Sequence, residues 1–301
     1  MNFSLKVDVD TYEGMRVGVP QLLQLFKNLK IKASFFVPFG PDESGKAIFR
    51  IFKKKGFLSK MFRTNALKIY GTKTILRGTL LPAPMIGESF PEIVRSIEKE
   101  GHELGIHGYN HVLWQDHLLK MKQETVRKQF ELGVAGFEKV MGRKPKGFAA
   151  PAWLCTPFSL KMVDEFQFSY ASDTRLGKFP FYPIMDGQEF KTLQIPSTLP
   201  TADELLGSDN ITQDNLGDHL FEIMKEVQLE FHVHTVHAEV EGMAILESFG
   251  RWLQKLRKEN VDFIPCEKIK ELLIHEPQKI PRSEIILKEI PGRSGVVSCQ
   301  K

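Results

Sequence analysis

The 301-residue sequence predicts an α/β protein in which a single parallel (β/α) barrel spans residues 1–301. Amphipathic, helix-like segments alternate with short apolar segments, which is the pattern of βα units around a parallel sheet. Residues that can carry chemistry follow several of the apolar segments, where such barrels place their active sites. No internal repeat or low-complexity linker divides the sequence, so we expect no second domain.

The expected elements follow one another in the order that a barrel requires. A first strand is expected at 5–10, where Val7 and Val9 alternate with acidic residues, and a second at 32–37, ended by a proline-containing break at 38–41. Helices are expected at 17–29, 90–100, 123–141, 160–166, 218–226, 246–260 and 267–273, and further strands at 146–150, 231–238 and 261–264. The turn-rich tail at 281–301 either covers part of the barrel mouth or stays loose, and its pattern leaves both possibilities open.

Two strand ends carry candidate catalytic groups. A period of two places Asp8 and Asp10 on one face of the first strand, where two neighbouring negative charges are costly unless a cation or a shared proton intervenes. The alternative is a solvated strand end. His237 lies near the end of the expected strand at 231–238, and the alternative for it is a core histidine bonded to a backbone carbonyl.

A pair of histidines is a candidate metal site. His107 and His111 are four residues apart, which predicts that both rings project from one side of a helical turn, and imidazole is the commonest metal ligand. The same spacing occurs on solvated helices, so the pair alone does not decide between the two. His102 and His117 lack this spacing and are interpreted as surface residues.

The order Asp-x-Asp, then His-x-x-x-His, then a late hydrophobic-x-His resembles the polysaccharide deacetylase (NodB-homology) family. The resemblance implies a distorted barrel of the NodB-homology type with about seven strands. It implies that Asp10, His107 and His111 bind one divalent metal ion. By its ligand chemistry, a site of one carboxylate and two imidazoles suits zinc, and manganese, cobalt or iron are also compatible. It further implies that Asp8 is the general base for the attacking water and that His237 is the general acid for the departing amine.

Other stretches resemble the branch of this family that removes a formyl group from a lipid-linked sugar. They include VDVDTYEG, KMFRTNALKIYG, SDTRLG, IPSTLPTADELLG, VHAEVEG and PGRSG, and together they run nearly from end to end of the chain. This resemblance implies hydrolysis of the formamide of undecaprenyl-phosphate-linked 4-deoxy-4-formamido-L-arabinose, a step toward aminoarabinose modification of lipid A and resistance to cationic antimicrobial peptides. The alternatives are a polysaccharide or peptidoglycan N-deacetylase and a non-catalytic glycolipid-binding module.

One position departs from the family pattern. Ala149 stands where the family usually has an arginine that orients the catalytic aspartate, and we hypothesise that Arg175 supplies the missing cation. Trp153 is expected to wall the sugar pocket, with a core position as the alternative. The resemblance places Asp173 and Glu239 near the substrate or behind the catalytic groups, and for Glu239 the alternative is a surface carboxylate.

A basic, aromatic-rich insertion is expected at 44–87, after the second strand. It contains no acidic residue and ten basic ones, so the rest of the chain carries a net charge of −6, because the whole chain carries +4. We expect it to contact an anionic membrane surface or the lipid phosphate through Lys53, Lys54, Lys55, Lys60 and Arg63. The alternative is a pair of helices with a solvated basic face, and no motif favours nucleic acid.

The bulk properties indicate a soluble enzyme. A chain with 42% hydrophobic and 26% charged residues can bury one large core. Three widely spaced cysteines suggest neither a disulfide framework nor a thiolate metal site. The first residues lack the pattern of a signal peptide, and no apolar run approaches the ~20 residues that span a bilayer. We therefore expect a cytoplasmic protein, bound peripherally to the inner face of the cytoplasmic membrane.

Overall fold

The computed structural model describes residues 1–46, 76–208, 210–293 and 295–301. Within this part of the chain, an eight-stranded sheet has the order β10-β1-β2-β3-β4-β5-β8, with β9 paired to β1, and all of its pairs are parallel. Its strands are β1 (Asn2–Asp8), β2 (Ser34–Val37), β3 (Glu103–Ile106), β4 (Gly147–Phe148), β5 (Tyr170–Ala171), β8 (Leu193–Gln194), β9 (Phe231–His237) and β10 (Asp262–Phe263). The prediction of an α/β barrel is confirmed.

Strand β1 pairs with three other strands of the sheet, β2, β9 and β10. It pairs with β9 along its whole length, from Asn2 opposite Phe231 to Asp8 opposite His237. The chain after β8 approaches β9 from the far end of the sheet, where the backbone N–H of Thr198 donates to the carbonyl of Val233 over 2.9 Å. This contact curls the sheet into an incomplete barrel.

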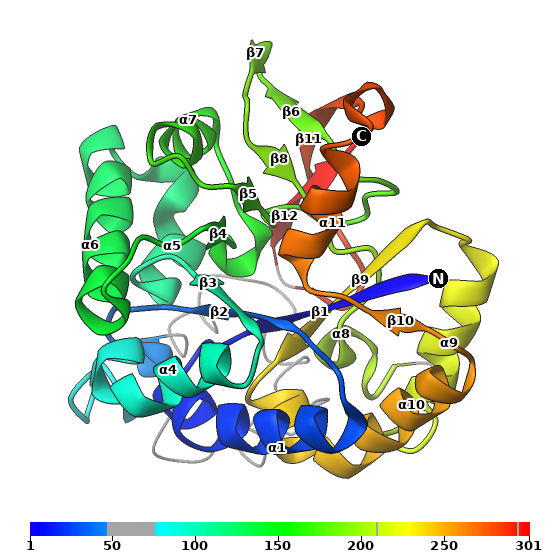
Figure 1. Cartoon of the computed structure of the whole chain (residues 1–301). Helices are drawn as coiled ribbons and strands as arrows, with labels where there is room; N and C mark the ends of the chain where they lie inside the picture. Colours follow the sequence, from blue (N-terminus) through cyan, green and yellow to red (C-terminus); the bar gives the residue numbers. More distant parts are fainter. Residues whose placement is uncertain (47–75, 209, 294) are drawn as a thin grey trace.

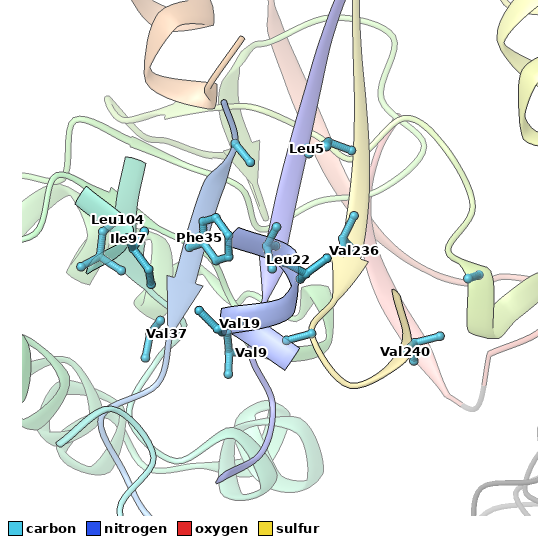
Figure 2. Close-up of a cluster of buried hydrophobic side chains, with 14 of the residues drawn as sticks. Leu5, Val9, Val19, Leu22, Phe35, Val37, Ile97, Leu104, Val236 and Val240 are labelled. Carbon is cyan, nitrogen blue, oxygen red and sulfur yellow. The ribbon is translucent and has the colours of Figure 1, made fainter. Parts of the chain in front are cut away.

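Helices cover the outer face of the sheet. In α1 (Val19–Leu29), the buried residues Val19, Leu22, Leu23 and Phe26 recur at spacings of three and four, so one stripe of the helix faces the strands. Figure 2 shows Val19 and Leu22 beside Phe35 of β2 and Val236 of β9. In the described ranges, the other α-helices are α4 (Pro91–Lys99), α5 (His111–His117), α6 (Gln123–Met141), α7 (Pro157–Glu165), α8 (Ala202–Leu205), α9 (Leu216–Glu226), α10 (Leu246–Lys258) and α11 (Cys266–Leu273).

The C-terminal tail belongs to a second sheet of order β12-β11-β6-β7, which extends away from the barrel (Figure 1). Its strands are β6 (Tyr182–Met185), β7 (Gln188–Glu189), β11 (Arg282–Glu289) and β12 (Val296–Gln300). Val297 and Cys299 of β12 share a buried cluster with Trp153. The possibility that the tail stays loose is therefore wrong, because β12 packs against Trp153.

The helices and strands lie close to their predicted positions, with boundary shifts of a few residues.

The interpretation of His102 as a surface residue is wrong, because its side chain is buried and Nδ1 accepts a hydrogen bond from the backbone of Ala33 over 3.2 Å. Short 3-10 turns are η3 (Gly87–Ser89), η4 (Leu118–Lys120), η5 (Pro151–Trp153) and η7 (Pro277–Lys279). Within the described ranges, no helix is both long and apolar enough to cross a membrane.

Candidate active site

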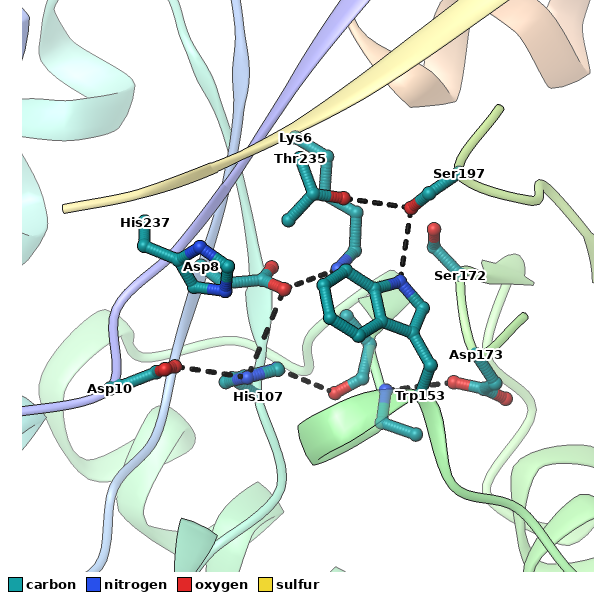
Figure 3. A network of polar contacts seen from close by, with 12 residues as sticks. Lys6, Asp8, Asp10, His107, Trp153, Ser172, Asp173, Ser197, Thr235 and His237 are labelled. Atoms are coloured by element: carbon teal, nitrogen blue, oxygen red, sulfur yellow. Dashed lines mark hydrogen bonds and ion pairs between the residues drawn. The ribbon is translucent and has the colours of Figure 1, made fainter. Parts of the chain in front are cut away.

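The predicted catalytic residues meet at the carboxyl edge of the sheet. Asp8 and His237 are the last residues of β1 and β9 and are paired in register, so their side chains lie next to each other. His107 follows β3 directly, and Asp10 lies two residues beyond the end of β1. Figure 3 shows the side chains of these four residues pointing toward one another. Because parallel strands end at the same edge, residues about 100 positions apart in the chain converge there.

Asp10, His107 and His111 form a group that could hold a metal ion. Their ligand atoms all lie within 4.8 Å of one another. Asp10 Oδ1 is 3.4 Å from Nε2 of His107 and 3.4 Å from Nε2 of His111. This oxygen is buried and has no hydrogen-bond partner among the described residues. A divalent cation fits such a set, because one carboxylate oxygen and two imidazole nitrogens then point their lone pairs at one place.

The two histidines converge by a route that differs from the predicted helical turn. His107 lies in the loop after β3, and only His111 is helical, as the first residue of α5. The extended residue Asn110 caps this helix by accepting a hydrogen bond from the backbone N–H of Leu113. His107 Nδ1 donates to the carbonyl of Ala149 over 2.9 Å, which turns Nε2 toward the site.

Electrostatics hold Asp10 in its charged form. Burial alone would raise the pKa of Asp10, but attraction to His111, the close approach of His107 and the charges of His237 and His107 together place that pKa well below its usual range. A carboxylate that stays ionised across the physiological range suits the role of a metal ligand.

Asp8 has a partner that was not predicted from the sequence, Lys6. The Lys6 ammonium donates to Asp8 Oδ2, and both side chains are almost completely buried. The second oxygen, Oδ1, has no hydrogen-bond partner among the described residues. The available signal was the alternation of β1, because Lys6 and Asp8 are two residues apart and therefore share a face.

His237 is surrounded by carboxylates. Its Nδ1 lies 3.6 Å from Asp203 Oδ1 in α8, and its backbone N–H donates to Glu241 over 2.9 Å. Burial by itself would lower the pKa of His237, but the charges of Asp203, Asp10, Glu241 and Asp8 outweigh it and raise that pKa above its ordinary value. Asp203 and Glu241 were not predicted from the sequence, and Asp203 lies on an element too short to be assigned from periodicity.

Glu239 supports the loop that carries Asp10. It is 1% exposed, so the alternative of a surface carboxylate is wrong. Its Oε1 accepts hydrogen bonds from the backbone N–H groups of Asp10 (3.0 Å) and Thr11 (2.8 Å) and from the Thr11 hydroxyl (2.8 Å). Burial, followed by the charge of Asp10, raises the pKa of Glu239. These contacts fix the direction of the chain just after β1.

Trp153 and Asp173 shape the loop opposite β1. Trp153 is 2% exposed, its indole N–H donates to Ser197 over 3.0 Å, and its ring lies edge-on to His237 with centroids 6.0 Å apart. Asp173 accepts hydrogen bonds from the backbone N–H of Ala150 (2.8 Å) and from Gln194 Nε2 (2.9 Å). Burial raises the pKa of Asp173 to about 6. Trp153 is thus buried, as the alternative of a core position expects, and its ring contacts His237; its role as a wall of the sugar pocket stays a prediction.

The hypothesis that Arg175 supplies the missing cation to Asp8 is wrong. Its guanidinium forms a bidentate salt bridge with the Glu204 carboxylate, with N–O distances of 2.7 and 2.8 Å, and also donates to the carbonyl of Leu199. The cation beside Asp8 is Lys6. Arg175 instead stacks over Trp153, with the guanidinium carbon 4.6 Å from the ring centroid.

Residues 47–75 lie outside the described part of the chain. The predicted membrane or lipid-phosphate contacts Lys53, Lys54, Lys55, Lys60 and Arg63 fall in this range. The expectation for them therefore stays a prediction.

An incomplete α/β barrel with one carboxylate and two imidazoles at its carboxyl edge, and a second carboxylate and imidazole beside them, defines the class of metal-dependent hydrolases of amide bonds. The family model described as polysaccharide deacetylase matches residues 8–170, which include Asp8, Asp10, His107 and His111. The chain belongs to the polysaccharide deacetylase family.

Two curated proteins are similar over nearly the whole chain. The chain is 38% identical to the probable 4-deoxy-4-formamido-L-arabinose-phosphoundecaprenol deformylase ArnD of Shewanella sediminis, over 98% of this chain and 93% of that protein. It is 35% identical to the protein of the same name from Wigglesworthia glossinidia brevipalpis, over 96% of this chain and 98% of that protein. The crystal structure of a probable polysaccharide deacetylase from Pseudomonas aeruginosa shares the fold, with a TM-score of 0.61 at 17% identity and 91% coverage of each chain.

Proposed function

We propose that this protein hydrolyses the formamide of undecaprenyl-phosphate-linked 4-deoxy-4-formamido-L-arabinose, releasing formate and the lipid-linked 4-amino sugar. The reaction would be a step toward aminoarabinose modification of lipid A and resistance to cationic antimicrobial peptides. The observation that carries the proposal is the convergence of Asp8, Asp10, His107, His111 and His237 at one edge of the barrel. The substrate is inferred from the similarity to two proteins named for this activity, at 38% and 35% identity.

Asp10, His107 and His111 would hold the metal. A divalent ion there would polarise the formyl oxygen and lower the pKa of a water at the same ion toward ~7. Zinc suits one carboxylate and two imidazoles with positions left open, and manganese, cobalt or iron would also be accepted by these oxygen and nitrogen ligands. The hydrogen bond from His107 to the carbonyl of Ala149 would keep the imidazole in the orientation that a ligand needs.

Asp8 and His237 would move the protons. Asp8 Oδ1, which lacks a hydrogen-bond partner among the described residues, is free to take a proton from the attacking water. An amine leaves an amide carbon readily only when its nitrogen is protonated, and His237 would donate that proton. The carboxylates around His237 favour its protonated form, as a general acid requires.

Formate release tests the proposal directly. The lipid-linked formamido sugar is incubated with wild type, His107→Ala and His117→Ala, each with and without a chelator. We expect wild type and His117→Ala to release formate only without chelator, because His117 is exposed and lies outside the site. His107→Ala should release none, since it removes one of three metal ligands.

Two other outcomes would replace the proposal. Acetate released from an N-acetylated glycan, without formate from the formamido sugar, would assign the same site to an N-deacetylase. A protein that binds the glycolipid, releases neither product and is indifferent to chelator would be a non-catalytic glycolipid-binding module.

We also propose that the protein binds the inner face of the cytoplasmic membrane through the insertion at 44–87, with no role for nucleic acid. This rests on its ten basic residues without an acidic one and on a substrate whose polyprenyl chain stays in the bilayer. Basic residues near an anionic surface contribute about 1 kcal/mol each. Reversing Lys53, Lys54 and Lys55 to Glu should therefore abolish co-sedimentation with phosphatidylglycerol vesicles. The matched control reverses the exposed Lys120 and Lys122, and equal loss in both variants would argue against the insertion as the contact.

A further inference from the structure

Lys6 is a charged residue in the interior of the barrel. It lies in the middle of β1, opposite Thr235 of β9 and Ser34 of β2, and it is 0% exposed. Its ammonium lies 5.6 Å from the ring centroid of Phe36 and 5.1 Å from that of Trp153. Few positions are less suited to a lysine, because a buried ammonium is strongly penalised unless a carboxylate accompanies it.

Asp8 is that carboxylate, and the pairing divides its two oxygens between two roles. Oδ2 accepts from the Lys6 ammonium, whereas Oδ1 is buried without a hydrogen-bond partner among the described residues (Figure 3). A carboxylate on a short side chain can rotate, and an ionic bond at one oxygen fixes where the other points. The indole of Trp153 and the ring of Phe36 limit where the ammonium can move, and their faces attract it.

Among the described residues, neither Arg175 nor the segment at Ala149 supplies a cation to Asp8. Ala149 has no charged side chain, and its carbonyl is used by His107. Arg175 is held by both oxygens of Glu204, and Arg293 also approaches Glu204, at 3.3 Å. His107 Nε2 is 3.9 Å from Asp8 Oδ2, but this nitrogen lies nearer to Asp10, at 3.4 Å.

We propose that Lys6 is a positioning residue, which holds Asp8 Oδ2 so that Oδ1 faces the attacking water. The inference rests on the proposed role of Asp8 as general base. In this chain the orienting cation is thus supplied from the same strand as the base, two residues earlier, and not from the loop at Ala149. Lys6 itself does not touch the substrate.

A double-mutant cycle separates positioning from structural support. The variants are Lys6→Met, Asp8→Asn and the double variant, with Lys32→Met as the control, because Lys32 bonds to the carbonyl of Glu100 away from the site. We expect Lys6→Met to lower kcat by roughly 100-fold with KM and bound metal unchanged. In the Asp8→Asn background, Lys6→Met should cause no further loss, because residues that act as one unit are not additive. Lys32→Met should match wild type.

Three results would overturn the proposal. The first is a kcat of Lys6→Met within about two-fold of wild type. The second is a kcat of the double variant that is reduced by the product of the two single reductions. The third is a Lys6→Met variant in which KM or the bound metal changes and kcat does not. Lys6→Met leaves the buried carboxylate of Asp8 unpaired, which can prevent folding. The same cycle is therefore also measured with Lys6→Gln, which keeps a hydrogen-bond donor but removes the charge. If wild type releases acetate and not formate, the proposed substrate fails, and the cycle is then measured on acetate release.

Discussion

At the scale of single residues, His237 has the environment of a general acid. Its Nδ1 lies 3.6 Å from Asp203 Oδ1, which also accepts a hydrogen bond from the Thr201 hydroxyl over 2.6 Å. Among the groups that raise the pKa of His237, Asp203 makes the largest contribution and opposes the effect of burial. Asp203 is therefore expected to set how far into the alkaline range His237 stays protonated.

Replacing Asp203 with Asn tests this expectation. Asn keeps an oxygen for the Thr201 hydroxyl but removes the negative charge, so the pKa of His237 should fall. A general acid works only while protonated, and activity is lost as the pH rises through its pKa. The alkaline limb of the kcat–pH profile should thus move to lower pH in Asp203→Asn. Asp214→Asn, at an exposed carboxylate paired with Arg251, should leave the limb in place. An unmoved limb in Asp203→Asn would assign the acid to another group.

Some residues of the site could be predicted from the sequence, and others could not. Asp10, His107 and His111 could be identified because their types and order are restrictive. The partner of Arg175 could not, because Glu204 reaches it through a short helix whose position depends on the whole fold. Lys6 was overlooked because a lysine is normally solvated, and only a strand buried on both faces forces it inside.

At the scale of elements, two π-helical turns support the loops of the site. They are η1 (Gly14–Gly18), which follows β1, and η6 (Val240–Ala244), which follows β9. A Cβ on Gly14 would lie 1.8 Å from Glu239 Oε1. A Cβ on Gly18 would lie 2.1 Å from the carbonyl of Ala238. Glycine is required at both positions because backbone and carboxylate occupy the space of a side chain.

Gly14→Ala should therefore damage the site at a distance. The added methyl group must displace Glu239, which releases the backbone N–H groups of Asp10 and Thr11 from their acceptor. We expect metal affinity, measured by calorimetric titration, to fall by about 10-fold or more, as is usual when a supporting contact of a ligand is lost. Gly250→Ala is the matched control, since its nearest neighbour is the flexible end of Leu25 at 3.3 Å. Equal affinities for both variants would contradict the supporting role of Glu239.

Elements with a clear period were predictable and those without one were not. The helices at α1, α6 and α10 show amphipathic spacing over many residues, so a local pattern defines them. The second sheet is different, because its two local antiparallel pairs, β6–β7 and β11–β12, are joined by the pairing of β6 with β11, which lie about 100 residues apart. Their formation depends on the barrel being present, which a local reading of the tail cannot supply.

At the scale of the whole molecule, the second sheet fastens the C-terminal tail to the side of the active site. The carbonyl of Ser298 accepts from the backbone N–H of Arg175 over 2.9 Å, and its hydroxyl accepts from the backbone N–H of Cys155 over 3.0 Å. Arg293, between β11 and β12, lies 4.4 Å from the ring centroid of Trp153. One short strand thus contacts the segments that carry Arg175 and Trp153.

Removing residues 291–301 should consequently impair catalysis more than metal binding. The deletion exposes Trp153 and removes Val297 and Cys299, which are each 1% exposed. Burial of a side chain the size of valine stabilises a fold by about 1.5–3 kcal/mol. Trp153 borders His237, so kcat and the melting temperature should both fall. The candidate metal ligands belong to other loops, so bound metal in the folded fraction should stay near the wild-type level. Ser298→Ala isolates one contact: it leaves the buried N–H of Cys155 without its acceptor, which costs about 1–3 kcal/mol, and should lower Tm with a smaller effect on kcat. A truncated protein with full kcat would show that the tail only stabilises the barrel. A truncated protein that folds but binds no metal would show that the tail instead supports Asp10, His107 and His111.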